Sequence, residues 1–575
     1  MKYIDIINSN KDLGDKLKID DYNIALLSNT VVHQLKDILE YSLRVDGISA
    51  KIKLGDYDNI VQDSHVYQDI PIVLIFWELS NIVDGLHHTL ELKNKEEYSQ
   101  LLEKIKAEIN LVLKNLDSNS LVLFNKFSSL SFTHMSLNSS KLDQLGSELN
   151  NFLSSLSQDN LKLVNVDKVI STIGVRKSID YRHYYSSKIL YTIDFLKEYS
   201  EFIKPYVLAA TGRSKKALIF DCDNTIWKGI LGEDGFEHIQ MSPATKDGQI
   251  FAEIQSIAIE AYSRGIILGL CSKNNLSDVD EVLDSHPDIQ IRDNNIVIKK
   301  INWNDKASNL REMAKELNIG LDSFVFVDDS PFEINLVKEQ LPEVSVLQVP
   351  EKLHQYPIIL REKLNLFYNL SSTLEDKKKS EMYKSQIQRE QLQKEFTDIE
   401  DYLSSLQIKM ELYCDEKRLI SRMSQMTQKT NQFNLTTMRY TESDINKFIR
   451  NSQSKVYAFS ISDKFGESGV TGLSIVNLDL NDKSAEFDTF LMSCRVIGRN
   501  IEYAFMNFII ENLKSEKVKI VKATYRKTKK NSQVSGFYKK CGFVQQSKSV
   551  DQTNYILSID DYKPSSINYI VMNKK

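Results

Sequence analysis

Two aspartates, Asp221 and Asp223, follow directly on the apolar run 217–220. A continuous apolar run of this kind is typical of a buried parallel strand, and α/β proteins bind ligands at the carboxyl ends of such strands. Two carboxylates at one strand end can perform covalent phosphoryl transfer, in which one attacks phosphorus and the other protonates the leaving oxygen. An isolated Asp-x-Asp is more often a turn or a helix cap, so this pair alone does not establish a catalytic site.

A serine and a lysine farther along the chain supply two more groups that phosphoryl transfer needs. The apolar run GIILGLCS ends in Ser272, whose hydroxyl can hold a phosphate oxygen. Lys306 begins a helical stretch after INWND and can neutralise the charge of the same phosphate. Both residues lie at a strand end or a helix start, where the functional side chains of an α/β sheet converge.

Asp328 and Asp329 end the apolar run FVFVDD and are candidate metal ligands. Carboxylate and carbonyl oxygens are the ligands that Mg²⁺ prefers in proteins. Asp221 and Asp223 offer further oxygens, the second through its backbone carbonyl. The sequence therefore predicts a Mg²⁺-dependent phosphotransfer site to which four separate stretches of the chain contribute.

Four segments carry or flank these residues. In residues 1–205, strand-like apolar runs alternate with amphipathic helical stretches, which predicts a doubly wound parallel α/β domain. Residues 206–350 repeat this alternation and hold the candidate site. The charged residues of 351–404, as in STLEDKKKSEMYKSQIQREQLQKEF, predict a solvated helical connector. Residues 405–575 combine helices with alternating strands, which predicts an α+β domain with mostly antiparallel strands.

The candidate site resembles motifs one to four of the haloacid-dehalogenase (HAD) superfamily. These motifs are hhhhDxDxT, hhhhhS, a lysine and hhhhDD, where h is an apolar residue, and they match in order across residues 216–345. The resemblance implies a HAD-like, Rossmann-type α/β domain. The segment between Thr225 and the helix expected near residue 248 is too short for a large cap domain, so we expect the site to be open to a bulky partner.

Longer stretches resemble the FkbH-like family of this superfamily over almost the whole chain. In order, they are DCDNTIWKGILGEDG (221–235), CSKNN (271–275), VDDSPFEINLV (327–337), RMSQMTQKTNQFNLTTMRY (422–440) and SCRVIGRNIE (494–503). The resemblance implies an enzyme that takes 1,3-bisphosphoglycerate, removes phosphate, and passes glyceryl through an enzyme thioester to the phosphopantetheine thiol of an acyl carrier protein. Such enzymes supply polyketide-type biosynthesis. Because an acyl phosphate is already activated, loading needs no ATP.

Three cysteines are candidates for the thiol that carries the acyl group. Cys222 lies between the two aspartates of the first motif, and a continued strand pleat would point its side chain away from theirs. Two nearby carboxylates would also raise its pKa. Cys271 ends the neighbouring strand, and Cys494 precedes a glycine loop. Each can instead be a small buried apolar residue, and Cys222 is the nearest candidate.

The last segment resembles the GNAT acyltransferases around SCRVIGRNIE and NSQVSGFYKKCGF. The resemblance implies an R-x-x-G-x-G/A loop, in which Arg495 and Gly498 would bind a cofactor pyrophosphate at a helix N-terminus. Asn500 stands where that loop has glycine or alanine, and its side chain can obstruct a pyrophosphate. We therefore expect this loop to receive a phosphopantetheine arm rather than acetyl-CoA.

The first segment is similar to SGNH hydrolases at two places. The triplet from Ser28 to Thr30 occupies the Gly-Asp-Ser positions, which would make Thr30 the nucleophile, and Asp180 and His183 reproduce the DxxH spacing. Because the triplet departs from the pattern, a degenerate SGNH-like scaffold that recruits a carrier protein is the expected role of this domain.

Composition and charge exclude several other classes of protein. A net charge of −5 offers no basic footprint for nucleic acid. The five cysteines are scattered, odd in number and without a CxxC spacing, which argues against a disulfide framework or a structural zinc site. The strongest apolar run, 72–77, is too short to span a bilayer, and the first residues lack a continuous apolar stretch. We expect a cytoplasmic enzyme with no nucleic-acid or membrane partner.

Two functions remain open at the level of sequence. The first is the glyceryl transferase/phosphatase that the FkbH-like resemblance implies. The alternative is a Mg²⁺-dependent phosphatase of a small phosphorylated metabolite, with flanking domains that only recognise a partner. A non-catalytic scaffold would lack Asp221, Asp223, Lys306 or Asp328, and all four are present.

Overall fold

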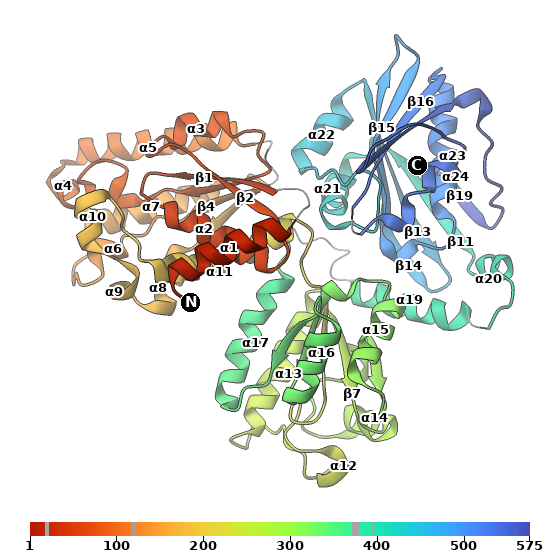
Figure 1. Cartoon of the computed structure of the whole chain (residues 1–575), viewed down its shortest axis with the longest axis horizontal. Helices are drawn as coiled ribbons and strands as arrows, with labels where there is room; N and C mark the ends of the chain where they lie inside the picture. Colours follow the sequence, from red (N-terminus) through yellow and green to blue (C-terminus); the bar gives the residue numbers. More distant parts are fainter. Residues whose placement is uncertain (18–21, 118, 120, 371–378, 394, 529) are drawn as a thin grey trace. The chain divides into compact units, whose positions relative to one another are not determined.

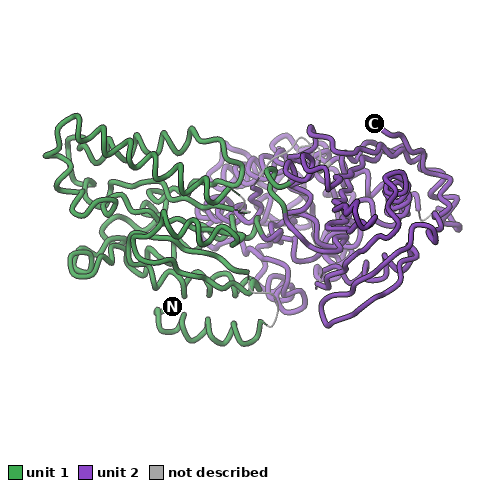
Figure 2. The backbone as a smooth tube through the Cα atoms, turned by 90° about the horizontal axis from the view of Figure 1, so that it is seen from above, with its two compact units in different colours: residues 1–210, 440–444 green, residues 211–439, 445–575 purple. Residues whose placement is uncertain are grey.

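The computed structural model describes residues 1–17, 22–117, 119, 121–370, 379–393, 395–528 and 530–575. The chain divides into two compact units, coloured separately in Figure 2. Unit 1 comprises residues 1–210 and 440–444, and unit 2 comprises residues 211–439 and 445–575. Unit 1 is built on one sheet and unit 2 on two, as Figure 1 shows.

Unit 1 contains a five-stranded parallel sheet with the strand order β2-β1-β3-β4-β5. The strands are β1 (Tyr22–Ser28), β2 (Ala50–Leu54), β3 (Ile72–Phe76), β4 (Leu121–Asn125) and β5 (Leu161–Val164). Every residue of β3 and β4 is buried, because helices cover both faces of the sheet, and this explains their continuous apolar sequence. The parallel α/β domain expected for the first segment is confirmed.

Helices form a layer on each face of this sheet (Figure 1). On one face, α2 (His33–Val45) contacts α1 (Tyr3–Lys16) and α11 (Ile193–Ala210). On the other, α5 (Lys95–Asn115) contacts α3 (Ile60–Val66) and α7 (Lys141–Ser155), and the buried residues of these three helices share one apolar core with β1, β3 and β4.

The first sheet of unit 2, here called the central sheet, is also parallel and has the order β10-β9-β6-β7-β8. Its strands are β6 (Ala217–Phe220), β7 (Ile267–Ser272), β8 (Ile298–Ile301), β9 (Phe324–Asp328) and β10 (Ser345–Gln348). Its helices are α13 (Gly248–Ser263), α14 (Leu276–Ser285), α15 (Lys306–Glu316), α16 (Pro331–Gln340) and α17 (Tyr356–Leu364). The strand order reverses at β6, and the carboxyl ends on either side of such a switch point form the ligand crevice of α/β proteins.

The segment between β6 and α13 is short and mostly irregular. Residues 224–247, all described, contain the one-turn helix α12 (Leu231–Asp234) and an isolated bridge between Lys228 and Gln240. No separate domain fits in this segment, which confirms that a large cap domain is missing there.

The second sheet of unit 2 has the strand order β17-β18-β16-β15-β14-β13-β11-β19, with β12 paired to β15. The strands are β11 (Ile408–Cys414), β12 (Phe433–Asn434), β13 (Ser454–Asp463), β14 (Gly466–Asp479), β15 (Ser484–Met492), β16 (Ile520–Arg526), β17 (Val544–Lys548), β18 (Gln552–Ser558) and β19 (Ile570–Lys574). The β15–β16 and β11–β19 pairs are parallel and the others are antiparallel. The mostly antiparallel α+β layout is thereby confirmed.

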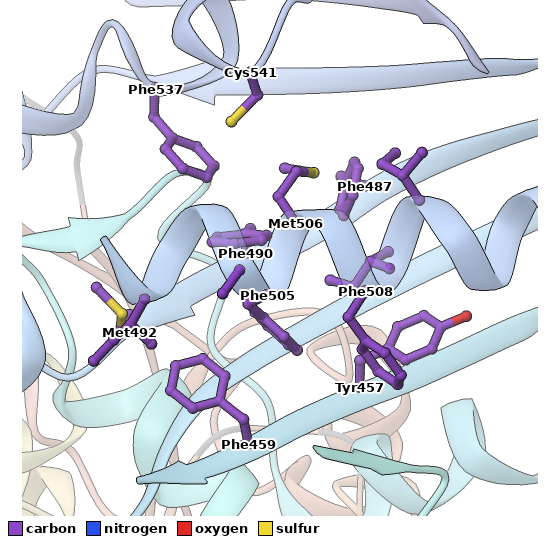
Figure 3. Packing of buried hydrophobic residues seen from close by; sticks show 14 of the residues in the cluster. Tyr457, Phe459, Phe487, Phe490, Met492, Phe505, Met506, Phe508, Phe537 and Cys541 are labelled. Carbon is purple, nitrogen blue, oxygen red and sulfur yellow. The ribbon is translucent and has the colours of Figure 1, made fainter. Parts of the chain in front are cut away.

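An aromatic core holds this sheet to α23 (Ile501–Ser515). The Phe505 ring packs against Phe459 and Phe490, with centroid distances of 4.7 and 5.4 Å, and Figure 3 shows these rings meeting between helix and sheet. Further helices of this part are α20 (Ile399–Ser405), α21 (Ile420–Lys429), α22 (Glu442–Arg450) and the short α24 (Phe537–Lys540).

The expected connector is helical, but parts of it are packed rather than solvated. Tyr356 and Leu360 of α17 belong to the core of the central sheet. In α19 (Lys379–Gln393), Met382, Tyr383 and Arg389 are buried. The expectation of a solvated segment is wrong for these residues, because a buried stripe that includes an arginine does not stand out as apolar in the sequence. Residues 371–378, where the charged run begins, lie outside the described residues.

Among the described residues, no helix combines the length and the apolar character needed to cross a membrane.

Candidate active site

Asp221, Lys306 and Asp328 form a buried cluster at the carboxyl end of the central sheet. Asp221 directly follows β6, Asp328 ends β9, and Lys306 begins α15. The Lys306 Nζ lies 3.0 Å from Asp221 Oδ1 and 2.5 Å from Asp328 Oδ2. None of the three residues is more than 5% exposed. The structure thus brings together three predicted site residues from three separate stretches of sequence.

The charges in this cluster do not balance. Burial raises the pKa of Asp221 to about 6, a rise that the Lys306 ammonium opposes and the Asp328 carboxylate increases. Burial also raises the pKa of Asp328 and of Asp329. Although burial disfavours its charge, Lys306 has a raised pKa because it faces Asp221 and Asp328. One ammonium therefore faces three carboxylates, and a divalent cation can neutralise the excess.

Asp221, Asp328 and Asp329 have the spacing of a metal site. One carboxylate oxygen of each lies within 4.8 Å of the others, and oxygen donors are the ligands that Mg²⁺ prefers. Asp221 and Asp328 are buried, which distinguishes the group from an acidic cluster on the surface. The three residues therefore fit Mg²⁺.

The Asp223 carboxylate is held by three N–H donors, and it does not join this metal-ligand group. Trp227 Nε1 and Leu231 N donate to Oδ1 at 2.9 and 3.0 Å, and Asn274 Nδ2 donates to Oδ2 at 2.9 Å. These bonds fix the orientation that a general acid needs. Sequence reasoning missed Trp227 and Asn274. Their sequence positions could have indicated them, because the Trp227 indole lies four residues after Asp223 and the Asn274 amide lies two residues after Ser272.

Ser272 lies beside the same cluster and is 1% exposed. Its hydroxyl accepts a hydrogen bond from Asn274 Nδ2 at 3.2 Å. It also interacts with the Asp221 carboxylate and opposes the rise of that residue's pKa. The hydroxyl is thus placed where a phosphate bound at Asp221 would meet it.

Cys222 is fully buried and packs in the core beneath the site with Phe220 and Ile226. Burial raises the pKa of its thiol well above the ordinary value, and the Asp221 carboxylate adds to the rise. The expected direction is confirmed, with burial as the larger cause. A buried, protonated thiol is not a nucleophile, so the structure does not support Cys222 as a ready acyl carrier.

The other two candidate thiols differ in access. Cys271 is buried, and burial raises its pKa. Cys494 is partly exposed and follows β15 in a short helical turn. Cys494 is therefore the most accessible of the three candidate thiols.

The loop after β15 carries Arg495 and Gly498, the predicted cofactor-binding pair. Gly498 has a φ of +86°, a conformation that favours glycine. The neighbouring Arg499 is buried, pairs with Asp463 at 3.1 Å and donates to the Arg495 carbonyl. Arg495 lines a cavity to which Gly498 does not contribute. Arg499 ties the loop into the protein interior, and binding of a cofactor pyrophosphate by Arg495 and Gly498 stays a prediction.

Unit 1 does not assemble the hydrolase constellation expected of an SGNH nucleophile. The Thr30 hydroxyl donates to the Lys188 carbonyl at 2.8 Å, so its proton is engaged by the backbone rather than by an imidazole. Asp180 caps the short helix α10 (Tyr181–Ser187) and bonds His183 Nδ1 at 2.7 Å. The DxxH spacing therefore has a local structural explanation.

Comparison with solved structures gives a match to a phosphatase-domain protein. No family model and no curated protein matches the chain. The N-terminal part of BF1531 from Bacteroides fragilis, solved with a phosphatase domain complexed with Mg, is 28% identical, with a TM-score of 0.54. The match covers 63% of this chain and 99% of that one.

Two acetyltransferase structures match a smaller part of the chain. They are the spermidine/spermine N-acetyltransferase SpeG from Vibrio cholerae and the ribosomal-protein-S18-alanine N-acetyltransferase from Escherichia coli. They cover 27% and 26% of this chain, and 95% and 94% of their own, at 15% and 12% identity. Their TM-scores of 0.22 and 0.20 are too low to support a conclusion.

The buried aspartate–lysine cluster and the likeness to a Mg-complexed phosphatase domain define the class of protein. The chain is a multidomain α/β enzyme. Its central sheet carries the candidate phosphotransfer cluster, and the chain is similar to a structure that contains a phosphatase domain complexed with Mg.

Proposed function

We propose that this enzyme is a Mg²⁺-dependent glyceryl transferase/phosphatase of the FkbH-like type. It takes 1,3-bisphosphoglycerate, releases phosphate, and loads glyceryl onto the phosphopantetheine thiol of an acyl carrier protein for polyketide or related biosynthesis. The observation that carries the proposal is the buried cluster of Asp221, Lys306 and Asp328, in a chain whose other stretches resemble that family.

The phosphatase half-reaction follows from the cluster. Lys306 and Ser272 hold the phosphate oxygens while an Asp221 oxygen attacks phosphorus, forming an aspartyl phosphate and breaking the bond to the leaving oxygen. Asp223 gives the leaving oxygen a proton and later accepts one from the water that hydrolyses the aspartyl phosphate. Mg²⁺ held by Asp221, Asp328 and Asp329 supplies charge neutralisation when bound.

The acyl half-reaction needs a thiolate. Attack on the acyl-phosphate carbonyl forms a C–S bond and breaks the C–O bond to phosphate, which leaves with the electron pair. Cys222 is buried and protonated, so it would have to be exposed before it could carry glyceryl. A carrier thiol that attacks the acyl phosphate directly satisfies the same chemical balance without this exposure.

Apolar side chains on the loops around the site support a macromolecular partner. Four exposed residues follow the carboxyl ends of β6, β7, β8 and β9 in turn: Ile230, Leu276, Trp303 and Phe332. Trp303 is 71% exposed and Phe332 is 68% exposed. We call these four residues the apolar rim. Exposed apolar groups gathered around a site mark surfaces that bind a partner.

The test is loading of a carrier protein, read by intact-protein mass spectrometry. The enzyme is incubated with 1,3-bisphosphoglycerate, Mg²⁺ and a panel of phosphopantetheinylated carrier proteins. We expect one carrier to gain the mass of glyceryl. The Cys222→Ala variant separates the two routes, because direct attack by the carrier survives this change and passage through Cys222 does not.

The second candidate is a phosphatase of a small phosphorylated metabolite, which the Mg-complexed phosphatase domain of the similar structure favours. The same experiment distinguishes it. Release of phosphate without an adduct on any carrier would contradict the transferase and leave the phosphatase.

A further inference from the structure

Unit 2 has a polar cavity at the amino end of the central sheet, opposite to the cluster around Asp221. The cavity has a volume of about 190 Å³. Lys216, just before β6, and Ser323, just before β9, line it. Lys216 and Asp221 are separated by the length of β6, and a strand rises about 3.3 Å per residue, so the cavity lies on the order of 17 Å from the phosphotransfer site.

Basic side chains dominate the wall of this cavity, which we call the basic cavity. Six line it: Arg213, Lys216, Arg422, Lys429, Arg495 and Lys530. Among the described lining residues the only carboxylate is Asp322, which forms an ion pair with Lys530. Basic groups thus exceed acidic groups by five. An enclosed site lined by charges of one sign attracts a ligand of the opposite sign.

Arg495 has an unsatisfied donor in this wall. The residue is only 8% exposed, and its guanidinium lies over the Tyr383 ring at 5.8 Å. Its buried Nε–H has no hydrogen-bond partner in the described structure. A buried donor without an acceptor is costly, so such a group in a cavity wall points to a ligand that brings an acceptor.

Gln432 has the complementary unsatisfied group, a hydrogen-bond acceptor. Its Oε1 is a buried acceptor without a donor among the described residues, and the side chain lines the same cavity. A ligand that satisfies both residues carries anionic oxygens for Arg495 and a hydroxyl for Gln432. The volume of 190 Å³ is below the roughly 300–1,000 Å³ of pockets for larger ligands, which favours a molecule of a few carbons over a nucleotide.

We propose that the basic cavity is a second phosphate site, which binds a small hydroxylated phosphomonoester away from the phosphotransfer aspartate. The proposal does not depend on glyceryl transfer, because it rests on residues at the other end of the sheet. Arg495 and Lys216 bind the phosphate dianion, and Gln432 accepts the ligand's hydroxyl hydrogen bond.

The experiment uses the full chain, with glycerol 3-phosphate as the probe. Isothermal titration calorimetry in EDTA measures its binding. Without Mg²⁺ the three carboxylates around Asp221 repel a phosphate, so the titration isolates the basic cavity. We expect one site per chain in the wild type and in Asp221→Asn. Arg495→Gln and Lys216→Gln should each weaken binding about tenfold or more. Arg418→Gln is the matched control, because Arg418 is 79% exposed and lies outside the cavity.

Thiol labelling gives an independent readout of position. Cys494 lines the basic cavity and is partly exposed, and Cys414 is the exposed cysteine that would compete. In a Cys414→Ser background, glycerol 3-phosphate should slow alkylation of Cys494, mapped by peptide mass spectrometry, and Arg495→Gln should abolish this protection. The proposal is overturned if the wild type shows no binding in EDTA. It is also overturned if Asp221→Asn removes binding while Arg495→Gln and Lys216→Gln retain it.

Discussion

At the scale of single residues, the candidate site is a set of buried charges in which carboxylates outnumber the one ammonium. Well-packed neighbours hold these charges in place. Asp221 and Asp328 are buried with one shared cation, Lys306, and breaking such a group is costly because it leaves an unpaired buried charge. The aspartate that attacks phosphorus must be an anion with a free oxygen. An amide of the same shape keeps the packing and loses the nucleophile.

We therefore expect Asp221→Asn to lower phosphate release by about a thousandfold or more, as for loss of an essential nucleophile. Folding should persist, because asparagine can still accept from Lys306. Malachite-green detection of phosphate measures the rate, and circular dichroism checks the fold. Asp284→Asn, at an exposed aspartate of the same domain, should leave the rate unchanged. Full turnover in Asp221→Asn would contradict the assignment of the site.

A second buried carboxyl, Glu78 in unit 1, takes no part in this chemistry. It accepts hydrogen bonds from the Ser80 hydroxyl at 3.0 Å and the Tyr191 hydroxyl at 2.5 Å. Burial raises its pKa above the ordinary value of 4.5, and these hydrogen bonds only partly oppose the rise. The folded state therefore binds the proton more tightly than the unfolded state. Its stability falls as the pH rises from about 4.5 through the raised value.

Glu78→Gln should remove this pH dependence. We expect the stability of the variant relative to the wild type to increase as the pH rises above about 4.5, because only the wild type has to ionise a buried group. Hydrogen exchange of β3 peptides, measured across this range, reports the stability of unit 1 locally. Glu103→Gln, at a side chain that is 67% exposed, is the matched control. A constant difference between variant and wild type would contradict the prediction.

At the scale of elements, α19 and the loop after β15 are joined by one buried carboxylate. Asp463, at the end of β13, pairs with Arg389 of α19 at 2.7 Å and with Arg499 of the loop at 3.1 Å. The side chains of all three are no more than 5% exposed. Burial and the neighbouring Arg389 lower the pKa of Arg499 to about 10. Two buried guanidinium groups thus depend on one anion.

Removal of the Asp463 charge should therefore destabilise the protein more than removal of one of the two arginine charges. We expect Asp463→Asn to lower the free energy of unfolding by about 3–5 kcal/mol, since it leaves two buried cations uncompensated. Arg389→Gln should cost less, because the remaining pair with Arg499 is neutral overall. Urea unfolding, monitored by tryptophan fluorescence, measures both changes in the free energy of unfolding. Arg418→Gln, at an exposed side chain, is the control. The reverse order of the two costs would contradict this account.

Periodicity predicted most of the elements, and it failed for α19. Strands such as β3 and β9 are buried along their whole length, so their apolar runs are visible without knowledge of their partners. The buried face of α19 includes Gln386 and Arg389. Whether a polar side chain is buried depends on a distant partner such as Asp463, and no local pattern contains that information.

At the scale of the whole molecule, the apolar rim is the surface through which we propose that the enzyme contacts a carrier protein. Its four residues come from four loops that the parallel sheet gathers at one end. A small substrate needs only the buried cluster, whereas a carrier protein must also contact the surface around it. A mutation on the apolar rim can therefore separate the binding of a carrier protein from the turnover of a small substrate.

Trp303→Ala should weaken carrier loading and spare hydrolysis of a small phosphate ester. We expect KM for the carrier to rise about tenfold, as for the loss of an aromatic anchor at an interface, with phosphate release from a small ester within about twofold of wild type. Steady-state kinetics with each substrate measures both values. Leu92→Ala, at an 84% exposed residue of unit 1, is the control. Equal losses on both substrates would point to damage to the site itself.

The sequence by itself determined the chemical groups of the site and the strands that present them. Asp221, Ser272 and Asp328 each end an apolar run, and in a parallel sheet such ends must meet. The parallel sheets and the missing cap domain follow from equally local patterns. For this reason the meeting of these side chains at one edge of the sheet could be predicted from the sequence.

Only the tertiary structure decided which of the other polar residues have access to a ligand. Cys222 lies next to Asp221 in the sequence and is buried in the core, while Cys494, far away in the chain, is partly exposed. Arg495 and Lys216 are far apart in the sequence and line the same cavity, to which Gly498, three residues from Arg495, does not contribute. Burial and charge environment are set by atoms that are distant in sequence, so spacing alone cannot predict them.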